Sequence, residues 1–260
     1  MPNFAGPETD FPIPMGFRWG TAEAKIRYTD RPDLAMVIGP VKGCSSAAVF
    51  TQNKFAAPPV LLCRQILAES KGRVGGIVVN SGCANAATGD LGMSNAQTMG
   101  KAAQASAKAE KPFFVCSTGT IGVQLPIDRI VTAMDGGANN AGETAEAFTG
   151  FASAILTTDT RRKIASAQFS HNGRPVTIVG CAKGAGMMQP NMATMLSYIF
   201  TDASAAPELL QEIFEAVNER SLNCVTVDGD TSTNDTAILL ASGESAVDIG
   251  TDSKLSLIHI

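Results

Sequence analysis

The segment that decides the class of fold is Lys183-Gly-Ala-Gly-Met-Met-Gln-Pro-Asn-Met-Ala193, which continues directly into Thr194-Met-Leu-Ser-Tyr-Ile-Phe-Thr201. Gly184 and Gly186 allow a close approach of the backbone that a Cβ would prevent. Pro190 fixes its own φ and keeps the residue before it out of helical space. The first half is therefore predicted to be a shaped loop. The second half is apolar and favours extended backbone, which predicts a buried strand.

The junction between this loop and strand carries a chemical implication. A small residue, Ala193, precedes a hydroxyl residue, Thr194, at the mouth of the strand. The Thr194 hydroxyl could attack the Ala193 carbonyl and shift the acyl group from nitrogen to oxygen, and water would then cleave the ester. Thr194 would gain a free α-amine with a pKa of about 7.7 to 8, a base suited to activating its own hydroxyl. The pattern by itself is more typical of an ordinary loop before a strand.

Composition places the chain among soluble globular proteins, with 45% hydrophobic and 17% charged residues in 260. A net charge of −4 argues against nucleic acid as a partner. No apolar run reaches the length of a membrane span, and the amino terminus has no signal-peptide pattern. The six cysteines are scattered, so we expect reduced, buried thiols and neither zinc nor disulfides. These features predict a cytoplasmic protein without a membrane association.

Short strands alternate with helices along the chain, which predicts a mixed α/β fold. Helix formers and apolar stripes predict helices over 91–111, 126–134, 143–156 and 207–220. Short apolar runs predict strands at 75–80, 113–117, 163–169, 175–180, 195–200 and 237–241. The Gly-bearing stretch 136–142 is predicted to be a loop. The order of the strands within the sheets does not follow from one sequence.

Several polar residues are candidates for a catalytic role. Thr118 and Gly119 follow an apolar strand and could supply two oxyanion donors, each worth about 2.7 to 4 kcal/mol, although Thr-Gly at the end of a strand is more often a plain turn. Lys183 could hold a substrate carboxylate or lie on the surface. The loop Asp228–Asp235 lacks the spacing of an EF-hand. His171 lies in a turn signal, so a Ser-His-Asp mechanism is poorly supported.

Several further motifs occur in a characteristic order. They are Pro14–Ala22, Val79–Ala86, Ser117–Gly122, Thr157–Thr160 and Val225–Asp235. Together with the loop before Thr194, they resemble the ornithine acetyltransferase (glutamate N-acetyltransferase) family of arginine biosynthesis. The resemblance extends from about residue 11 to residue 247, which is nearly the whole chain.

The resemblance implies a fold and a set of site residues. The fold would be of the ornithine acetyltransferase type, similar to N-terminal-nucleophile enzymes, with sheets flanked by helices. Self-cleavage between Ala193 and Thr194 would divide an α-chain region, 1–193, from a β-chain region, 194–260. By the resemblance, Thr194 is the nucleophile and Thr118 and Gly119 form the oxyanion hole. Substrate would be bound by Thr157, Lys183 and Thr194, with Thr158 as a neighbouring alternative to Thr157.

The resemblance also implies an activity. The enzyme would move an acetyl group from N-acetylornithine to glutamate by ping-pong covalent catalysis, forming ornithine and N-acetylglutamate. No cofactor and no metal are expected, and whether acetyl-CoA also serves as a co-substrate is left open. The expected assembly is a heterotetramer of two α and two β chains.

Two alternatives to this activity remain compatible with the sequence. An N-terminal-nucleophile amidase or aminopeptidase would share Thr194 but pass the acyl group to water. An inactive fragment is the other alternative, because family members carry a longer segment after the nucleophile than 194–260. The sequence therefore predicts a β-chain region truncated at its carboxyl end, a non-native stretch at 255–260, and poor solubility or inactivity of the chain as written.

Overall fold

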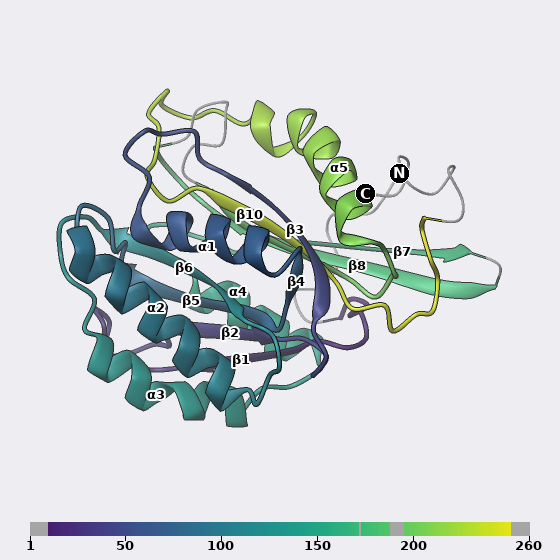
Figure 1. Cartoon of the computed structure of the whole chain (residues 1–260), viewed down its shortest axis with the longest axis horizontal. Coiled ribbons are helices and arrows are strands. Elements are labelled where there is room, and N and C mark those ends of the chain that lie inside the picture. Colours follow the sequence, from purple (N-terminus) through teal and green to yellow (C-terminus); the bar gives the residue numbers. More distant parts are fainter. Residues whose placement is uncertain (1–9, 172, 188–194, 251–260) are drawn as a thin grey trace.

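The computed structural model describes residues 10–171, 173–187 and 195–250 and contains two stacked sheets with helices on their outer faces (Figure 1). The four-stranded sheet has the order β1 (Arg18–Ala22), β2 (Leu34–Ile38), β5 (Gly76–Cys83), β6 (Phe113–Thr120). The six-stranded sheet has the order β4 (Arg73–Val74), β3 (Cys44–Phe50), β10 (Thr236–Ala241), β9 (Leu196–Thr201), β8 (Arg174–Lys183), β7 (Lys163–His171).

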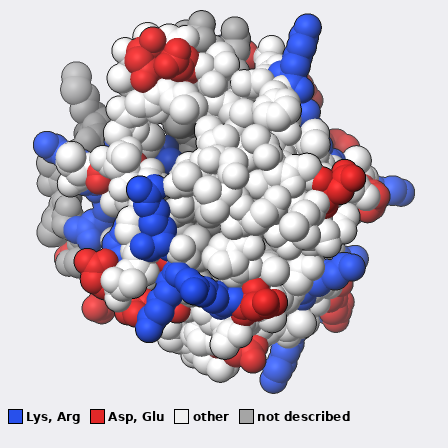
Figure 2. Space-filling view, turned by 90° about the vertical axis from the view of Figure 1, so that its left-hand side faces the viewer, with Lys and Arg blue, Asp and Glu red and all other residues white. Residues whose placement is uncertain are grey.

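Each sheet contains one parallel pair among antiparallel neighbours. β5 pairs in parallel with β6, and β9 pairs in parallel with β10 at the centre of the larger sheet, between β3 and β8. The carboxyl ends of β5 and β6 therefore lie together at one edge. This edge is the left-hand end of the molecule in Figure 1, and Figure 2 shows it face on.

The helices cover the sheets and close the space between them. α2 (Gly89–Ser106) and α3 (Ile127–Asn139) cover the outer face of the four-stranded sheet, and α5 (Pro207–Glu219) covers that of the six-stranded sheet. α1 (Pro58–Glu69) contacts β6 and β3, one strand of each sheet. α4 (Ala145–Ala154) contacts β1 and β2 of the smaller sheet and β7 and β8 of the larger. A short 3-10 turn, Leu222–Cys224, follows α5.

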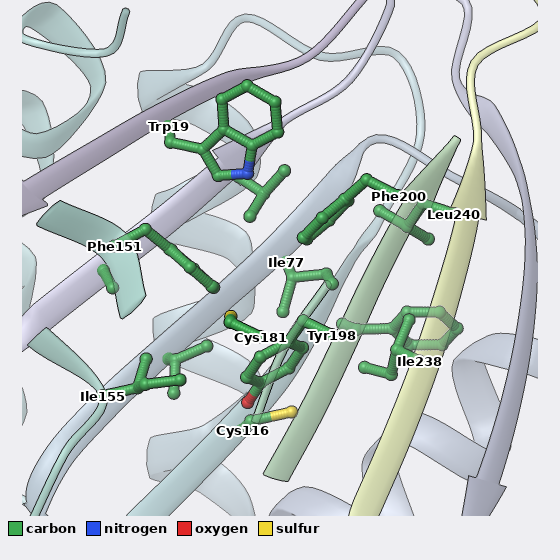
Figure 3. Close-up of a cluster of buried hydrophobic side chains, with 14 of the residues drawn as sticks. Trp19, Ile77, Cys116, Phe151, Ile155, Cys181, Tyr198, Phe200, Ile238 and Leu240 are labelled. Atoms are coloured by element: carbon green, nitrogen blue, oxygen red, sulfur yellow. The ribbon is translucent and has the colours of Figure 1, made fainter. Parts of the chain in front are cut away.

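The main core lies between the two sheets because side chains alternate along each strand. In β5, Ile77 and Val79 face the other sheet, while Val78 faces the outer helices. Figure 3 shows Tyr198 and Phe200 of β9 in this layer with Trp19 and Phe151. The Phe151 and Tyr198 ring centroids are 5.5 Å apart and nearly perpendicular, an arrangement worth about 0.5 to 1.5 kcal/mol beyond the buried area.

The predicted loop 136–142 begins too early, because α3 continues through Gly136 and Gly137 to Asn139. These glycines do not end the helix. A Cβ built at Gly20 in β1 would lie 1.9 Å from the Gly137 carbonyl oxygen, and one built at Gly137 would lie 3.2 Å from the Met36 sulfur. Small residues on both sides therefore let α3 approach the sheet closely.

The remaining predicted helices and strands are present. The helix predicted over 91–111 is α2, which ends at Ser106 and not at 111. The prediction made no mention of β1 to β4 or of α1. All six cysteines are free thiols, but Cys224 is exposed, so the prediction that they are buried is wrong there. Within the described ranges, no helix has both the length and the apolar character needed to cross a bilayer.

Candidate active site

A cavity of about 670 Å³ lies at the carboxyl ends of β5 and β6. Its lining comes from six segments that are far apart in sequence, and includes Arg27, Tyr28, Ala84, Thr118, Gly119, Thr120, Thr157, Thr158, Lys183, Gly186, Met187, Asp228, Asp230, Ser232 and Asn234. On this end of the molecule, Lys and Arg side chains lie among Asp and Glu side chains (Figure 2). Four predicted site residues thus share one cavity, whereas Ala193 and Thr194 lie outside the described residues.

Thr118 and Gly119 lie where β6 meets the end of β5. Gly119 has a φ of +132°, and a Cβ at this position would lie 2.3 Å from the carbonyl carbon of Gly82 in the neighbouring strand. Only glycine fits this backbone and this contact. Thr118 is nearly buried, and its hydroxyl forms no hydrogen bond with the described part of the chain, so it can donate to a ligand in the cavity.

Asn234 connects a distant loop to both of these strand ends. Its buried Nδ2 donates to the carbonyl oxygen of Ala84, at 2.7 Å, and to that of Ser117, at 3.0 Å. One amide thereby fixes the chain just beyond β5 relative to β6 next to Thr118. The sequence drew attention to the loop Asp228–Asp235 without giving Asn234 a role, and only its amide in a polar loop beside a strand could have indicated one.

Lys183 is the last residue of β8 and is only 5% exposed, which excludes the alternative of a surface lysine. Its Nζ lies 3.4 Å from Thr157 Oγ1. Burial lowers the pKa of Lys183, and the negative charges of Asp159 and Asp235 oppose that shift. Because Lys183 bonds to Thr157 and not to Thr158, the geometry favours Thr157 over its neighbour for the predicted substrate contact.

Asp159 acts on Lys183 through its charge and bonds to the residue that follows Lys183. Its side chain has no exposed surface, and its Oδ1 accepts hydrogen bonds from Lys163 Nζ at 2.5 Å and from Gly184 N at 2.9 Å. Burial raises the pKa of Asp159, but the bonds from Lys163 and Gly184 and the charges of Lys163 and Lys183 outweigh burial, so the pKa is lowered. Asp159 thereby fixes the backbone of Gly184, at the start of the Gly-rich loop.

The loop Asp228–Asp235 holds both residues that flank the undescribed segment 188–194. Asp228 Oδ2 accepts a hydrogen bond from Met187 N at 2.5 Å, and Asp235 Oδ1 accepts one from Met195 N at 2.9 Å. Met195 directly follows the predicted nucleophile in sequence. The two carboxylates therefore attach both flanks of the segment that contains the predicted cleavage site to the loop that lines the cavity. This is a structural role that the sequence left unassigned.

His171 takes no part in this arrangement, because it ends β7 and does not line the cavity. Over the described residues, no group of three or more His, Cys, Asp or Glu side chains is placed to hold a metal ion. The cavity offers hydroxyls, a buried amine, a guanidinium and backbone N–H groups, which suit acyl transfer with oxyanion stabilisation. The carboxylates of Asp228 and Asp230 line it as well.

Comparison with known proteins shows the family. The model of the ArgJ family matches residues 18–257. The chain belongs to the ArgJ family. The arginine biosynthesis bifunctional protein ArgJ of Geobacter sulfurreducens is 45% identical over 231 residues, which are 88% of this chain and 57% of that protein. The chain thus spans a little over half of the length of the curated ArgJ proteins that it matches.

Solved structures agree with the mixed α/β fold. The ArgJ of Bacillus halodurans is 36% identical with a TM-score of 0.63, and the match covers 69% of this chain and 92% of that one. The ornithine acetyltransferase of Mycobacterium tuberculosis, solved with ornithine, is 30% identical with a TM-score of 0.60. That match covers 70% of this chain and 95% of the other chain. An aminopeptidase and amidase of Ochrobactrum anthropi, described as a variant of the Ntn hydrolase fold, has a TM-score of 0.52 at 11% identity. That match covers 92% of this chain and 76% of the other chain. The predicted fold class is confirmed.

In this ArgJ-family chain, Asp159→Asn is expected to lower the free energy of unfolding by about 1 to 3 kcal/mol at pH 7, because a buried charged acceptor is lost. The folded pKa of Asp159 lies below its ordinary value of 3.8. Its stabilisation is therefore complete above that ordinary value and is lost as the pH falls through the folded pKa. Denaturant unfolding at pH 7 and at several values below pH 4 measures this dependence.

The matched control is Asp135→Asn, since the exposed Asp135 has one hydrogen-bond partner within the described residues, the hydroxyl of Ser106. We expect this control to change stability by less than about 0.5 kcal/mol. A difference between the wild type and Asp159→Asn that does not change with pH would contradict an electrostatic role of Asp159.

Proposed function

We propose that the protein to which this chain belongs carries out acetyl transfer from N-acetylornithine to glutamate, with Thr194 as the covalent nucleophile. The observation that carries the proposal is that Thr118, Gly119, Thr157 and Lys183 line one cavity. The same cavity adjoins Met187 and the loop that bonds to Met195, so both flanks of the segment that contains Thr194 are held beside it. The names of the ArgJ and ornithine acetyltransferase relatives support this substrate class.

The proposed first half-reaction forms an ester. The free α-amine of Thr194 takes the proton from its own Oγ, and Oγ attacks the acetyl carbonyl of N-acetylornithine. Thr118 Oγ and Gly119 N donate hydrogen bonds to the oxyanion that develops. The intermediate collapses as the Thr194 ammonium returns its proton to the departing ornithine nitrogen. The acetyl group is left on Thr194 Oγ.

The proposed second half-reaction reverses these steps with another amine. The glutamate amine attacks the acetyl ester, the same two donors hold the oxyanion, and the Thr194 amine accepts the proton that the nucleophile loses. Threonine Oγ leaves and is reprotonated, and N-acetylglutamate departs. No cofactor or metal enters these steps. Acetyl-CoA would serve as an alternative acetyl donor to the same Oγ.

We further propose that the chain cuts itself between Ala193 and Thr194. The Gly- and Pro-bearing loop before the scissile bond supports this proposal, since such a loop can hold a strained peptide. The two ArgJ-type solved chains support it as well. About seven tenths of this chain covers more than nine tenths of each of them, a coverage that a chain ended by this cut would produce. The α-chain region would then be 1–193 and the β-chain region would begin at Thr194.

We also propose how the cut protein assembles and where it acts. Two α and two β chains would form a heterotetramer in the cytoplasm. Size-exclusion chromatography with light scattering, combined with a denaturing gel, measures the mass of the assembly and the masses of its pieces. A particle that contains one copy of each piece would contradict the heterotetramer.

Acetyl transfer is tested with the purified protein, N-acetylornithine and isotopically labelled glutamate. We expect labelled N-acetylglutamate, parallel double-reciprocal lines, and one acetyl group added to the fragment that begins Thr194-Met195. Intersecting lines without an acetylated fragment would indicate direct transfer in a ternary complex. Release of acetate with no transfer to glutamate would instead indicate the amidase alternative.

A further inference from the structure

We propose that Arg27, together with the hydroxyl of Thr120, binds the α-carboxylate of both amino-acid substrates. The inference rests on the proposed acetyl transfer and adds a specificity-determining residue to that site. Arg27 was not among the residues predicted from the sequence. It lines the cavity together with Thr118, Gly119 and Lys183.

The position of Arg27 is determined by a buried carboxylate. Asp33 is fully buried, and its two carboxylate oxygens accept hydrogen bonds from Ala24 N at 2.8 Å and Ile26 N at 2.6 Å. The Asp33 carbonyl oxygen in turn accepts from Ser81 N at 2.9 Å. The residues just before Arg27 are thus attached to β5, and Arg27 is presented on an ordered loop.

Gly82 allows Arg27 to lie against the strand end. This glycine has a φ of +98°, and a Cβ built on it would be 2.8 Å from the Arg27 Cβ. The Arg27 guanidinium reaches across to β6, where its Nη1 donates to Thr120 Oγ1 at 2.6 Å. Thr120 is the residue after Gly119, so the guanidinium is held beside the proposed oxyanion donors.

The carboxylates of Asp228 and Asp230 line the same cavity, and Arg27 is available for an anion because neither of them pairs with it. Among the described residues, no carboxylate pairs with Arg27, and its one hydrogen-bond partner is a neutral hydroxyl. Lys183, in contrast, is influenced by the negative charges of Asp159 and Asp235. A guanidinium presents several N–H groups in a planar fork that matches a carboxylate. Thr120 accepts from Arg27 through its oxygen and retains its own O–H to donate to the same carboxylate.

The chemistry of the two half-reactions identifies the anion. The acetyl group leaves the α-nitrogen of N2-acetylornithine and joins the α-nitrogen of glutamate at one and the same Thr194 Oγ. The α-carboxylate is attached to the carbon that bears this nitrogen, so it must occupy one place in both half-reactions. The side chains differ in charge and cannot share such a subsite. One fixed cation beside the oxyanion donors therefore serves both substrates.

Arg27→Gln tests this assignment with two acetyl donors. For N2-acetylornithine we expect kcat/KM to fall roughly 10- to 100-fold, the loss typical of a hydrogen bond to a charged group. N-Acetylputrescine has the same skeleton without the α-carboxylate. We expect the wild type to use it more poorly than N2-acetylornithine by a similar factor, and Arg27→Gln to leave its rate unchanged. Thr120→Val should show the same selectivity with a smaller loss.

Two measurements exclude an indirect effect. Arg174→Gln is the matched control, since Arg174 is exposed and bonds a carbonyl oxygen, that of Ala246, at 3.2 Å without lining the cavity. It should leave both rates unchanged. Self-cleavage of Arg27→Gln should proceed as in the wild type, which shows that the variant folds. Equal losses for both donors, or no loss for N2-acetylornithine, would overturn the assignment.

A binding measurement separates this inference from the proposed function. By calorimetry, ornithine should bind the wild type roughly 10- to 100-fold more tightly than putrescine, and Arg27→Gln should remove the difference. If the wild type fails to transfer acetyl groups but shows this Arg27-dependent preference, the proposed function is wrong and the carboxylate site stands. If transfer occurs but ornithine and putrescine bind equally, the carboxylate site is wrong.

Discussion

Thr194→Ala is expected to leave the chain uncut and to reduce acetyl transfer roughly 10⁴- to 10⁶-fold, the loss seen when a covalent nucleophile is removed. One atom serves both reactions, because the Oγ that would attack the Ala193 carbonyl is the Oγ that would take the acetyl group. Met195, the next residue, is held by Asp235, so the substitution should not disturb the strand that follows. Denaturing gels and steady-state kinetics measure the two losses.

Thr194→Ser is the matched variant, since it keeps a hydroxyl at the same position. We expect it to cleave and to transfer at reduced rates, with an acetylated fragment visible by mass spectrometry. If Thr194→Ala were cut and active, both the nucleophile and the cleavage site would have been misassigned.

Gly119→Ala is expected to damage folding and catalysis together. Its Cβ would lie 2.3 Å from Gly82 C and 2.6 Å from Cys83 N, and both are backbone atoms that cannot move aside without separating β5 from β6. We expect the free energy of unfolding to fall by at least about 2 to 3 kcal/mol. We also expect kcat to fall about 10²- to 10³-fold, because the oxyanion donors would move from their positions.

Gly122→Ala is the control for this substitution. Gly122 also has a positive φ, +80°, but a Cβ there would meet nothing within 4 Å. Its expected cost is therefore only that of the backbone conformation, about 1 to 2 kcal/mol, with kcat unchanged. Chemical unfolding and kinetics on both variants separate steric overlap from backbone strain. Equal effects at the two positions would show that the contact with Gly82 has no special importance.

The accuracy of the sequence-based predictions varied with how local the signal was. The strand at 195–200 was predicted because Gly and Pro precede a clear apolar run. β2 was missed, although all five of its residues are buried, because a short apolar run without alternation cannot be distinguished from a piece of buried helix. Gly136 and Gly137 were predicted to lie in a loop because nothing near them in sequence shows that Gly137 contacts Gly20 in β1, more than 100 residues away in the chain.

In the candidate site, too, residues in local motifs could be predicted and residues that depend on distant contacts could not. Local motifs indicated Thr118, Gly119, Thr157 and Lys183, and the structure places them around one cavity. Asp159, Asn234 and Arg27 were not predicted because their roles depend on contacts between distant segments. Asn234, for example, bonds to carbonyl groups 117 and 150 residues before it. No local pattern of residues encodes such a contact.

The order of strands in the larger sheet has a consequence for a chain that has been cut at Thr194. β9 and β10 would belong to one piece, and they lie between β3 and β8 of the other. The two pieces would be interleaved through backbone hydrogen bonds on both sides, so they could separate only if the sheet itself unfolded. Before the cut, refolding is a unimolecular event at any dilution. After it, two molecules must meet, so recovery from denaturation would depend on protein concentration. Self-cleavage would thus turn a fold that one molecule can regain alone into one that must be reassembled from two pieces.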